Sequence, residues 1–181
     1  MTTPSYKDPP KIHTDFYNSE YMLSGLHNNF GIRTCWSMED HPRMGKWKIS
    51  GSGSAAGISL YFHPELFSEA LPKPYKCGED IDVVVTSVIS HEAGHILCKH
   101  PQELNRDPNV LAMLDKGEGH KLPLADRELV YKTELEAWAV GDTVIMQCLL
   151  NDPSFDANWS DKLHSKFKAH CLNTYKKGLA L

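Results

Sequence analysis

The sequence has no apolar run near the roughly 20 residues that a membrane-spanning helix needs. Its opening stretch, MTTPSYKDPPKIHTDF, lacks the apolar segment of a secretory signal peptide. Basic residues are not in excess either, because the formal net charge is −4, and a nucleic-acid surface usually needs a basic patch. We therefore expect neither a membrane protein nor a nucleic-acid-binding protein.

Cysteine is scarce and scattered. The five cysteines are odd in number, and none belongs to a CxxC pair. Disulfide-stapled domains and cysteine-rich zinc ribbons both depend on paired cysteines, so neither class is expected. Unpaired thiols suit a reducing compartment, and we expect the protein to be cytoplasmic.

Internal repeats and low-complexity tracts are also missing, which leaves no sign of a repeat protein. The hydrophobic content of 41% and the charged content of 23% are ordinary for a globular protein. A chain of 181 residues is long enough for one domain with a sizeable core. Residues 1–12 contain three prolines and predict a loose leader, and residues 13–181 are predicted to form a single domain.

The first element after this leader is predicted to be a helix over residues 13–31. Thr14 or Asp15 can cap it, because a side-chain oxygen can accept hydrogen bonds from the free amides of a first turn. Gly31 can end it, because glycine readily adopts the backbone conformation found just beyond many helices.

A small antiparallel sheet is predicted to follow. The runs KWKIS (46–50) and GISLYF (57–62) have the composition of strands. They are joined by GSGSAAG (51–57), whose glycines and serines indicate a flexible connection. GIRTCWS (31–37) is a candidate third strand.

The second half of the chain predicts helices at residues 81–100, 107–119, 126–150 and 160–178. Asp80 or Asp82 can cap the first of them. Its three consecutive valines would also suit a strand, but two histidines four residues apart share a face only on a helix. The last helix has one face that repeats every four residues: Leu163, Phe167, Cys171 and Tyr175.

The two histidines lie in VISHEAGHILCKH (88–100) and belong to an HExxH motif formed by His91, Glu92 and His95. Residues i and i+4 of a helix are separated by about 40° around the axis and about 6 Å along it, so both imidazoles can reach one tetrahedral metal. Glu92 would lie at the flank of that site. There a glutamate can accept a proton from a metal-bound water and pass it to a leaving nitrogen.

The HExxH motif alone does not establish a metal site, because a helix with two buried, hydrogen-bonded histidines carries the same letters. A zinc peptidase also needs a third protein ligand and an open fourth position for water. Gly94 adds context. Glycine lowers helix stability by roughly 1 kcal/mol relative to alanine, so its presence beside His95 indicates that another element packs closely there.

HEAGHILCKH (91–100) followed by ELEAWAVG (134–141) resembles the paired motifs of gluzincin metallopeptidases, HExGHxxxxH and ExEADxxG. The HtpX-like membrane peptidases and the ImmA/IrrE-like peptidases of bacteria and phages carry versions of both. The likeness covers these two motifs, and the first half of the chain has no counterpart in it. It implies an α+β, zincin-like single domain, in which a small antiparallel sheet accompanies an active-site helix and further packed helices.

The resemblance implies that His91 and His95 bind Zn²⁺ and that Glu92 is the general base that activates a zinc-bound water. The third ligand of the family is the glutamate four residues before an Asp or Asn, a position that falls on Glu134. Glu136 is the alternative. It lies about 200° away around the helix, so the two glutamates cannot face the same metal.

This chain departs from the family at Trp138. The family has an Asp or Asn there, which accepts a hydrogen bond from a ligand histidine and so orients it. An indole can donate a hydrogen bond but cannot accept one from an imidazole N–H. We therefore expect another acceptor, either a backbone carbonyl or Asp142, to orient the histidine.

Four further residues are weaker candidates. Tyr131 or His120 could stabilise the negative charge that develops on a substrate carbonyl oxygen, although a tyrosine at a core edge and an exposed loop histidine are the more ordinary interpretations. His100 lies about 140° further round a continuous helix than His95, so we expect it to orient a neighbour rather than bind metal. Cys98 is expected to be a small buried side chain.

We therefore predict a zinc-dependent metallopeptidase that hydrolyses peptide bonds of polypeptide substrates. Peptidases of this kind bind an extended substrate as an added strand at the edge of the sheet, and residues 57–62 are the candidate edge. Two alternatives remain. One is a binding or regulatory module of the same fold with metal but little turnover, and the other is a helical interaction protein with a chance HExxH.

Overall fold

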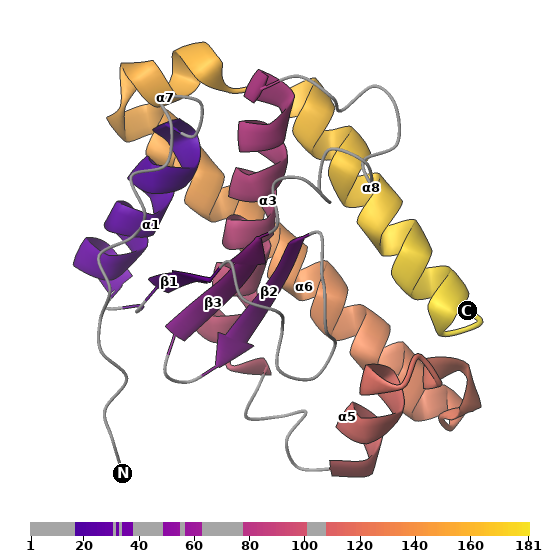
Figure 1. The fold of residues 1–181 in the computed structure, drawn as a ribbon. Coiled ribbons are helices and arrows are strands. Elements are labelled where there is room, and N and C mark those ends of the chain that lie inside the picture. Colours follow the sequence, from indigo (N-terminus) through magenta and orange to yellow (C-terminus); the bar gives the residue numbers. More distant parts are fainter. Residues whose placement is uncertain are drawn as a thin grey trace, which may run out of the picture.

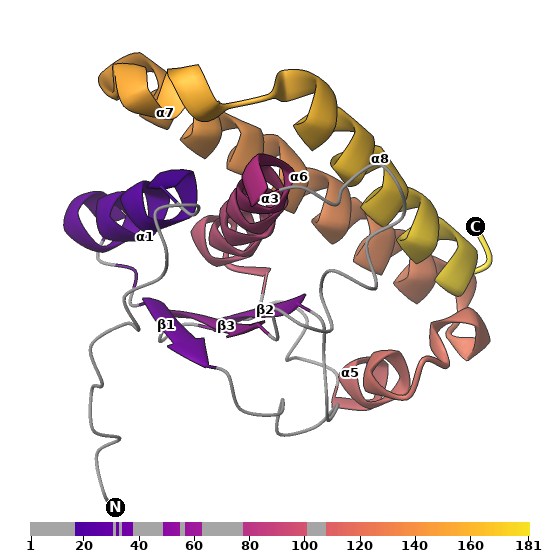
Figure 2. The ribbon, with the colours of Figure 1, turned by 45° about the horizontal axis from the view of Figure 1, so that its top comes forward.

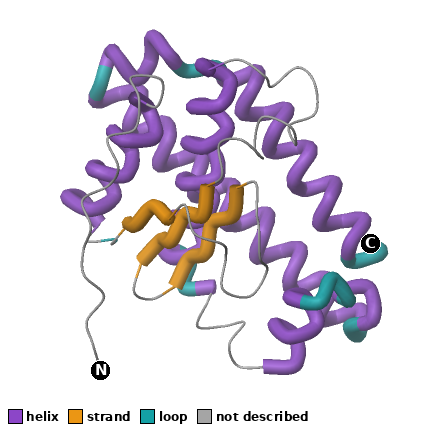
Figure 3. Tube along the Cα trace, in the orientation of Figure 1, coloured by secondary structure: helices purple, strands orange, loops and turns teal. Residues whose placement is uncertain are grey.

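Figure 1 shows the fold of the chain in a computed structural model. The structure describes residues 17–30, 32, 34–37, 49–54, 57–62, 78–100 and 108–181. Figure 3 draws the others in grey, and in the three strands it is the backbone that is described. The predicted leader at 1–12 lies outside the described residues, as do the predicted helix caps Thr14 and Asp15.

The prediction of an α+β fold with a small antiparallel sheet is wrong. Helices contain 86% of the residues whose side chains the structure describes. The three short strands form a mixed sheet in the order β1-β3-β2: β1 (Thr34–Ser37), β2 (Ile49–Ser54) and β3 (Gly57–Phe62). β2 is antiparallel to β3, but β1 is parallel to it. A short β-rich run indicates a strand but not the partner with which it pairs, which is why the sequence pattern did not show the parallel pair.

β3 is the central strand, so the prediction that residues 57–62 form the substrate-binding edge is wrong. Its backbone pairs with β1 on one side and with β2 on the other. The predicted flexible connection is also wrong, because Gly51 to Ser54 belong to β2 and pair with Leu60 to Gly57. The ladder hydrogen bonds to β3 stabilise these small residues in a strand, although they have little β preference of their own.

The described helices are α1 (Tyr17–Phe30), α3 (Gly78–Leu97), α5 (Pro108–Asp115), α6 (Leu124–Asn151), α7 (Pro153–Asn158) and α8 (Asp161–Gly178), with a 3₁₀ turn, η2 (Gly119–Lys121). Each of the five predicted helices has a counterpart here, and α7 is additional. None of the helices in the described part of the chain is long and apolar enough to cross a membrane.

The sequence NDP at 151–153 ends one helix and begins the next. Asp152 follows the end of α6, and its carboxylate accepts hydrogen bonds from the amides of Ser154 and Phe155, at 2.7 and 3.4 Å. Pro153 is the first residue of α7, a position that suits proline because the first amide of a helix needs no partner within it. The helix predicted over residues 126–150 therefore ends at Asn151, one residue later than predicted, and a second helix begins at Pro153.

α3 is the central helix of the fold. Figure 2 shows the sheet on one side of α3 and helices α6 and α8 on the other, with α1 beside it. Buried apolar side chains of these helices meet in the main core, whose largest members include Met22, Leu26, Ile89, Trp138 and Phe155. Full burial of such a side chain contributes about 1.5–3 kcal/mol, so the core holds α3 firmly against α1 and α6.

Asp82 joins α1 to α3. The prediction that Asp80 or Asp82 caps its own helix is wrong, because α3 begins at Gly78, before both. The Asp82 carboxylate instead accepts hydrogen bonds from the backbone amides of Asn18 and Ser19, at 2.9 and 3.0 Å. These amides lie in the first turn of α1, where a helix offers them no carbonyl partner. Burial raises the pKa of Asp82, against the opposing effect of these hydrogen bonds.

Candidate metal centre

Two glycines let α3 and α6 touch backbone to backbone. A Cβ atom on Gly94 would lie 2.0 Å from the carbonyl oxygen of Ala137, and one on Gly141 would lie 2.8 Å from the carbonyl oxygen of Ser90. Both distances are too short for real atoms, so a larger residue at either position would force the helices apart. The close packing predicted at Gly94 is confirmed, and it places the HExxH motif of α3 against the ELEAWAVG stretch of α6.

Gly94→Ala is expected to destabilise the fold by about 1–3 kcal/mol, the usual cost of overpacking. This loss should appear even though alanine favours an isolated helix by roughly 1 kcal/mol over glycine, because the added methyl group would push α3 away from α6. Urea unfolding followed by circular dichroism measures the change. Gly25→Ala on α1 is the matched control, since a Cβ atom there would lie 3.9 Å from its nearest neighbour, Nδ2 of Asn29. This variant should be as stable as wild type or more stable. Equal stability of Gly94→Ala and wild type would contradict the contact.

His91, His95 and Glu134 meet where α3 packs against α6, and we refer to them as the His–His–Glu cluster. Their potential ligand atoms all lie within 4.8 Å of one another. The Nε2 atoms of His91 and His95 are 3.2 Å apart. The two carboxylate oxygens of Glu134 lie 3.1 Å from His91 Nε2 and 3.5 Å from His95 Nε2. The structure thus brings together the three residues predicted as metal ligands, with Glu134 and not Glu136 as the third.

The cluster has the charge and shape of a cation site. Oε2 of Glu134 faces His91 but has no hydrogen-bond partner among the described residues. Burial by itself would raise the pKa of Glu134, but the neighbouring imidazoles of His91 and His95 outweigh burial and lower the pKa to about 2. An ionised carboxylate and two imidazoles that face one point fit a zinc ion, which binds nitrogen and oxygen ligands.

Glu92 lies at the flank of the cluster, as its place in the HExxH motif predicts. Its side chain is half-buried on α3. Burial lowers the pKa of His95, but the neighbouring Glu134 carboxylate, followed by the charge of Glu92, raises it above its ordinary value. Glu92 is therefore near enough to the cluster for its charge to act on His95.

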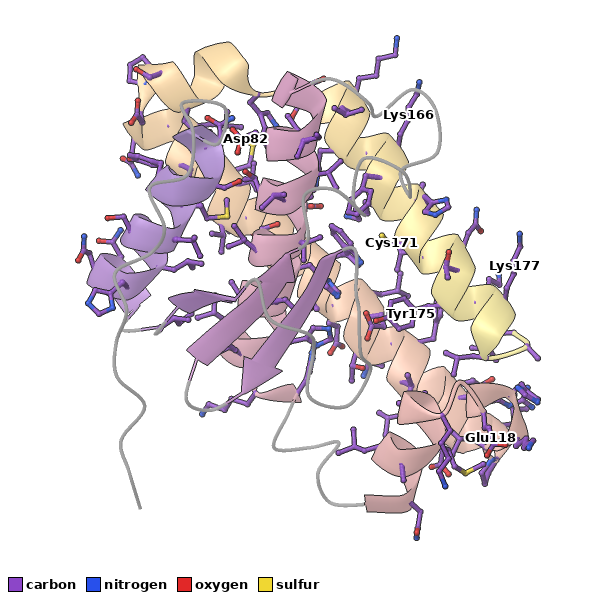
Figure 4. All side chains as sticks on the ribbon, in the orientation of Figure 1. Asp82, Glu118, Lys166, Cys171, Tyr175 and Lys177 are labelled. Atoms are coloured by element: carbon purple, nitrogen blue, oxygen red, sulfur yellow. The ribbon has the colours of Figure 1, made fainter. Side chains whose placement is uncertain are left out.

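Tyr175 of α8 also reaches the cluster, a role that sequence reasoning missed. The charge of Glu134, then burial, then the charge of Glu92 raise the pKa of Tyr175 well above its ordinary value. Figure 4 shows Cys171 and Tyr175 on the side of α8 that faces α6. Tyr175 is nevertheless 39% exposed, so solvent can reach it. The four-residue repeat of the last helix showed this face, but not what it would contact.

The prediction that Asp142 orients a ligand histidine is wrong. Its carboxylate instead interacts with His164 Nε2 at 2.9 Å and with Lys168 Nζ at 2.6 Å. Nδ1 of His91 is buried without a hydrogen-bond partner among the described residues, so no backbone carbonyl of that part of the chain orients it. Trp138 stacks on the His91 ring, with centroids 4.5 Å apart and an angle of 25° between planes. Aromatic packing therefore holds His91 where a hydrogen bond was expected.

A Ser–His–Asp series lies beside Trp138, whose ring centroid is 6.0 Å from that of His164. Ser87 Oγ is 2.8 Å from His164 Nδ1, and His164 Nε2 is 2.9 Å from Asp142. The order of residues is that of serine hydrolases, but the two ring nitrogens are exchanged. Ser87 is also 0% exposed inside α3, and its hydroxyl donates its hydrogen to the Val83 carbonyl at 2.6 Å. No substrate can reach such a serine. The series instead ties α3, α6 and α8 together behind the cluster.

The two residues suggested as stabilisers of negative charge lie in other surroundings. Tyr131 packs against a second apolar cluster, formed by Val110, Leu122, Val130 and Leu179. His120 is exposed on η2. Within the described part of the chain, no hydrogen bond or ion pair joins either side chain to the His–His–Glu cluster. The role suggested for them stays a prediction.

Comparison of the chain with protein-family models, with curated proteins and with solved structures finds no match. The resemblance to gluzincin peptidases therefore rests on the two motifs, and the function has to be argued from the residues of this chain.

Proposed function

We propose that the chain is a zinc-dependent peptidase that hydrolyses peptide bonds in polypeptide substrates. The observation that carries the proposal is the convergence of His91, His95 and Glu134, with Glu92 at the flank. Two imidazole nitrogens and one carboxylate oxygen are a donor set used by catalytic zinc, which keeps a fourth position open. Purely structural zinc sites usually fill all four positions with protein ligands.

The residues in and around the cluster can supply the metal ligands, the general base and a hydrogen-bond donor that peptide hydrolysis needs. Zinc in such a site lowers the pKa of a bound water and polarises a substrate carbonyl. Glu92 would accept the proton of the attacking water and return it to the leaving nitrogen. Tyr175 is a candidate donor to the carbonyl oxygen as negative charge develops on it, since its hydroxyl lies within the influence of Glu134 and Glu92. Tyr131 and His120, the candidates from the sequence, are the alternatives for this role as donor to the carbonyl oxygen.

We also propose that an extended peptide adds to an outer strand of the sheet. Within the described sheet, β1 and β2 are the outer strands, and the backbone of an outer strand can pair with a peptide. β2 is the better candidate because it packs against α3, the helix that carries His91 and Glu92. This edge replaces residues 57–62, which are central in the sheet.

Cys148 and Cys171 form no disulfide within the described part of the chain. Such thiols suit a reducing compartment, and we propose a cytoplasmic location on that ground. Burial, followed by the charge of Asp152, raises the pKa of Cys148 to about 11. Burial, followed by the charge of Glu134, raises the pKa of Cys171 to about 12. Thiols with such values are poor nucleophiles, which favours the metal site over a cysteine peptidase.

Zinc-dependent cleavage of a denatured lysate tests the proposal. Zinc-loaded protein should create new N-termini, which mass spectrometry can map. A chelator should stop their formation and added zinc should restore it. Glu134→Ala purified in the same way controls for a contaminating peptidase and should cleave nothing. Wild-type protein that carries zinc but creates no new N-termini would favour the regulatory module with metal and little turnover. Absence of bound zinc would refute the metal site itself.

A further inference from the structure

His95 has a second buried neighbour outside the His–His–Glu cluster. Its Nδ1 lies 3.1 Å from Nδ1 of His100. Nε2 of His100 lies 3.2 Å from Oε2 of Glu136, on α6. His100 is 1% exposed. A hydrogen-bonded series thus runs from Glu136 through His100 to His95, and it meets the nitrogen of His95 that does not face Glu134.

The backbone turns sharply to place His100 in this series. α3 ends at Leu97, and Lys99 has a φ of 61°, a left-handed conformation that residues other than glycine seldom adopt. On a continuous helix His100 would lie about 140° from His95 around the axis. The turn instead brings the two rings together, with centroids 5.2 Å apart. Strained residues persist chiefly where the surrounding structure uses the conformation.

The positions of the hydrogens in this series follow from Glu136, because an ionised carboxylate can only accept hydrogen bonds. The carboxylate of Glu136 accepts, so Nε2 of His100 carries the hydrogen. A neutral His100 then has a lone pair at Nδ1, and His95 donates to it from its own Nδ1. Nε2 of His95 therefore keeps its lone pair. This is the atom that faces His91 and Glu134.

We propose that His100 and Glu136 are positioning residues that hold His95 in the tautomer and orientation needed to bind zinc. The inference rests on the metal site of the proposed function. Partners of this kind tune many metal-binding histidines, and their loss commonly weakens metal binding about 10–100-fold. Here a second imidazole stands between the carboxylate and the ligand. Trp138 stands where the gluzincin motif has an Asp or Asn, and the series takes over the orienting role of that residue. It acts on His95. His91 is held by stacking on Trp138.

Zinc affinity of the full-length protein, measured by competition with a chromophoric chelator, tests the inference without a peptidase assay. His100→Phe and Glu136→Ala should each lower the affinity about 10–100-fold. His100→Asn should recover part of the loss, because its side-chain oxygen can accept from His95. Lys132→Ala is the control. Lys132 is the exposed partner of Glu136, at 3.5 Å, and its loss should leave the affinity unchanged. Circular dichroism establishes that each variant is folded. Because Glu136 is half-exposed, Glu136→Ala removes the end of the series without creating a cavity in the core.

The ¹⁵N NMR signals of the histidine side chains give a second readout. In metal-free wild type, the neutral form of His95 should carry its single hydrogen on Nδ1, and this preference should weaken in Glu136→Ala. A hydrogen on Nε2 of His95, or equal zinc affinity in wild type, His100→Phe and Glu136→Ala, would overturn the inference and leave the proposed function standing. A wild-type protein that binds no zinc would overturn both.

Discussion

Glu92→Gln is expected to lower the rate of peptide hydrolysis by at least about 100-fold, within the 10²–10⁴-fold that a general base typically contributes. Glutamine keeps the size and most of the hydrogen-bonding capacity of glutamate, but its amide cannot accept the proton. Glu92 is not a member of the His–His–Glu cluster, so the variant should still bind one zinc per chain. The turnover of a library-derived peptide and the zinc content of the same sample measure the two quantities.

The matched control for this substitution is Glu128→Gln, because Glu128 is an exposed glutamate on α6. It makes the same chemical change away from the cluster and should keep wild-type turnover. If Glu92→Gln cleaves as fast as wild type, Glu92 is not the base, whatever the metal does. If Glu92→Gln loses its zinc as well, the loss of activity would report on the site's integrity and not on proton transfer.

Glu134→Ala is expected to weaken zinc binding by more than about 100-fold, beyond the range usual for residues that only orient a ligand. Glu134 supplies the oxygen of the cluster, and its carboxylate stays ionised because the two imidazoles lower its pKa to about 2. Its removal would leave two of the three proposed protein ligands, the nitrogens of His91 and His95. Zinc content after dialysis and competition with a chelator measure the effect.

Glu136→Ala is the natural comparison, because it removes the same carboxylate two residues further along α6. Its side chain is 47% exposed and contacts His100, whereas that of Glu134 is 8% exposed and contacts both cluster histidines. Glu136→Ala should therefore weaken zinc binding less than Glu134→Ala. The reverse order would move the third ligand about half a turn around the helix. It would refute the alignment that places Glu134 at the third ligand of the gluzincin motif.

The sequence by itself determined those features that depend on residues close together in the chain. The spacing of His91 and His95 places them on one helical face, because four residues make little more than one turn. Glycine lowers helix stability relative to alanine, so Gly94 indicated a close contact with another element. The structure shows this contact with the backbone of Ala137. The end of α6 followed from the proline just beyond it, because proline cannot continue a helix. Propensity, capping and periodicity are local properties, so the sequence carries them directly.

Only the tertiary structure decided which distant residues meet. Nothing local distinguishes Asp82 as a cap for α1, since Asn18 and Ser19 lie more than sixty residues away in the chain. The parallel pairing of β1 with β3 depends in the same way on the path of the chain between them.

The immediate surroundings of the His–His–Glu cluster were also decided at this level. Trp138 stacks on His91, Tyr175 approaches Glu134 from α8, and the turn at Lys99 brings His100 back to His95. Each contact depends on how one helix or turn is placed against another. That placement is set by close packing of the whole core, and no repeat within one segment encodes it.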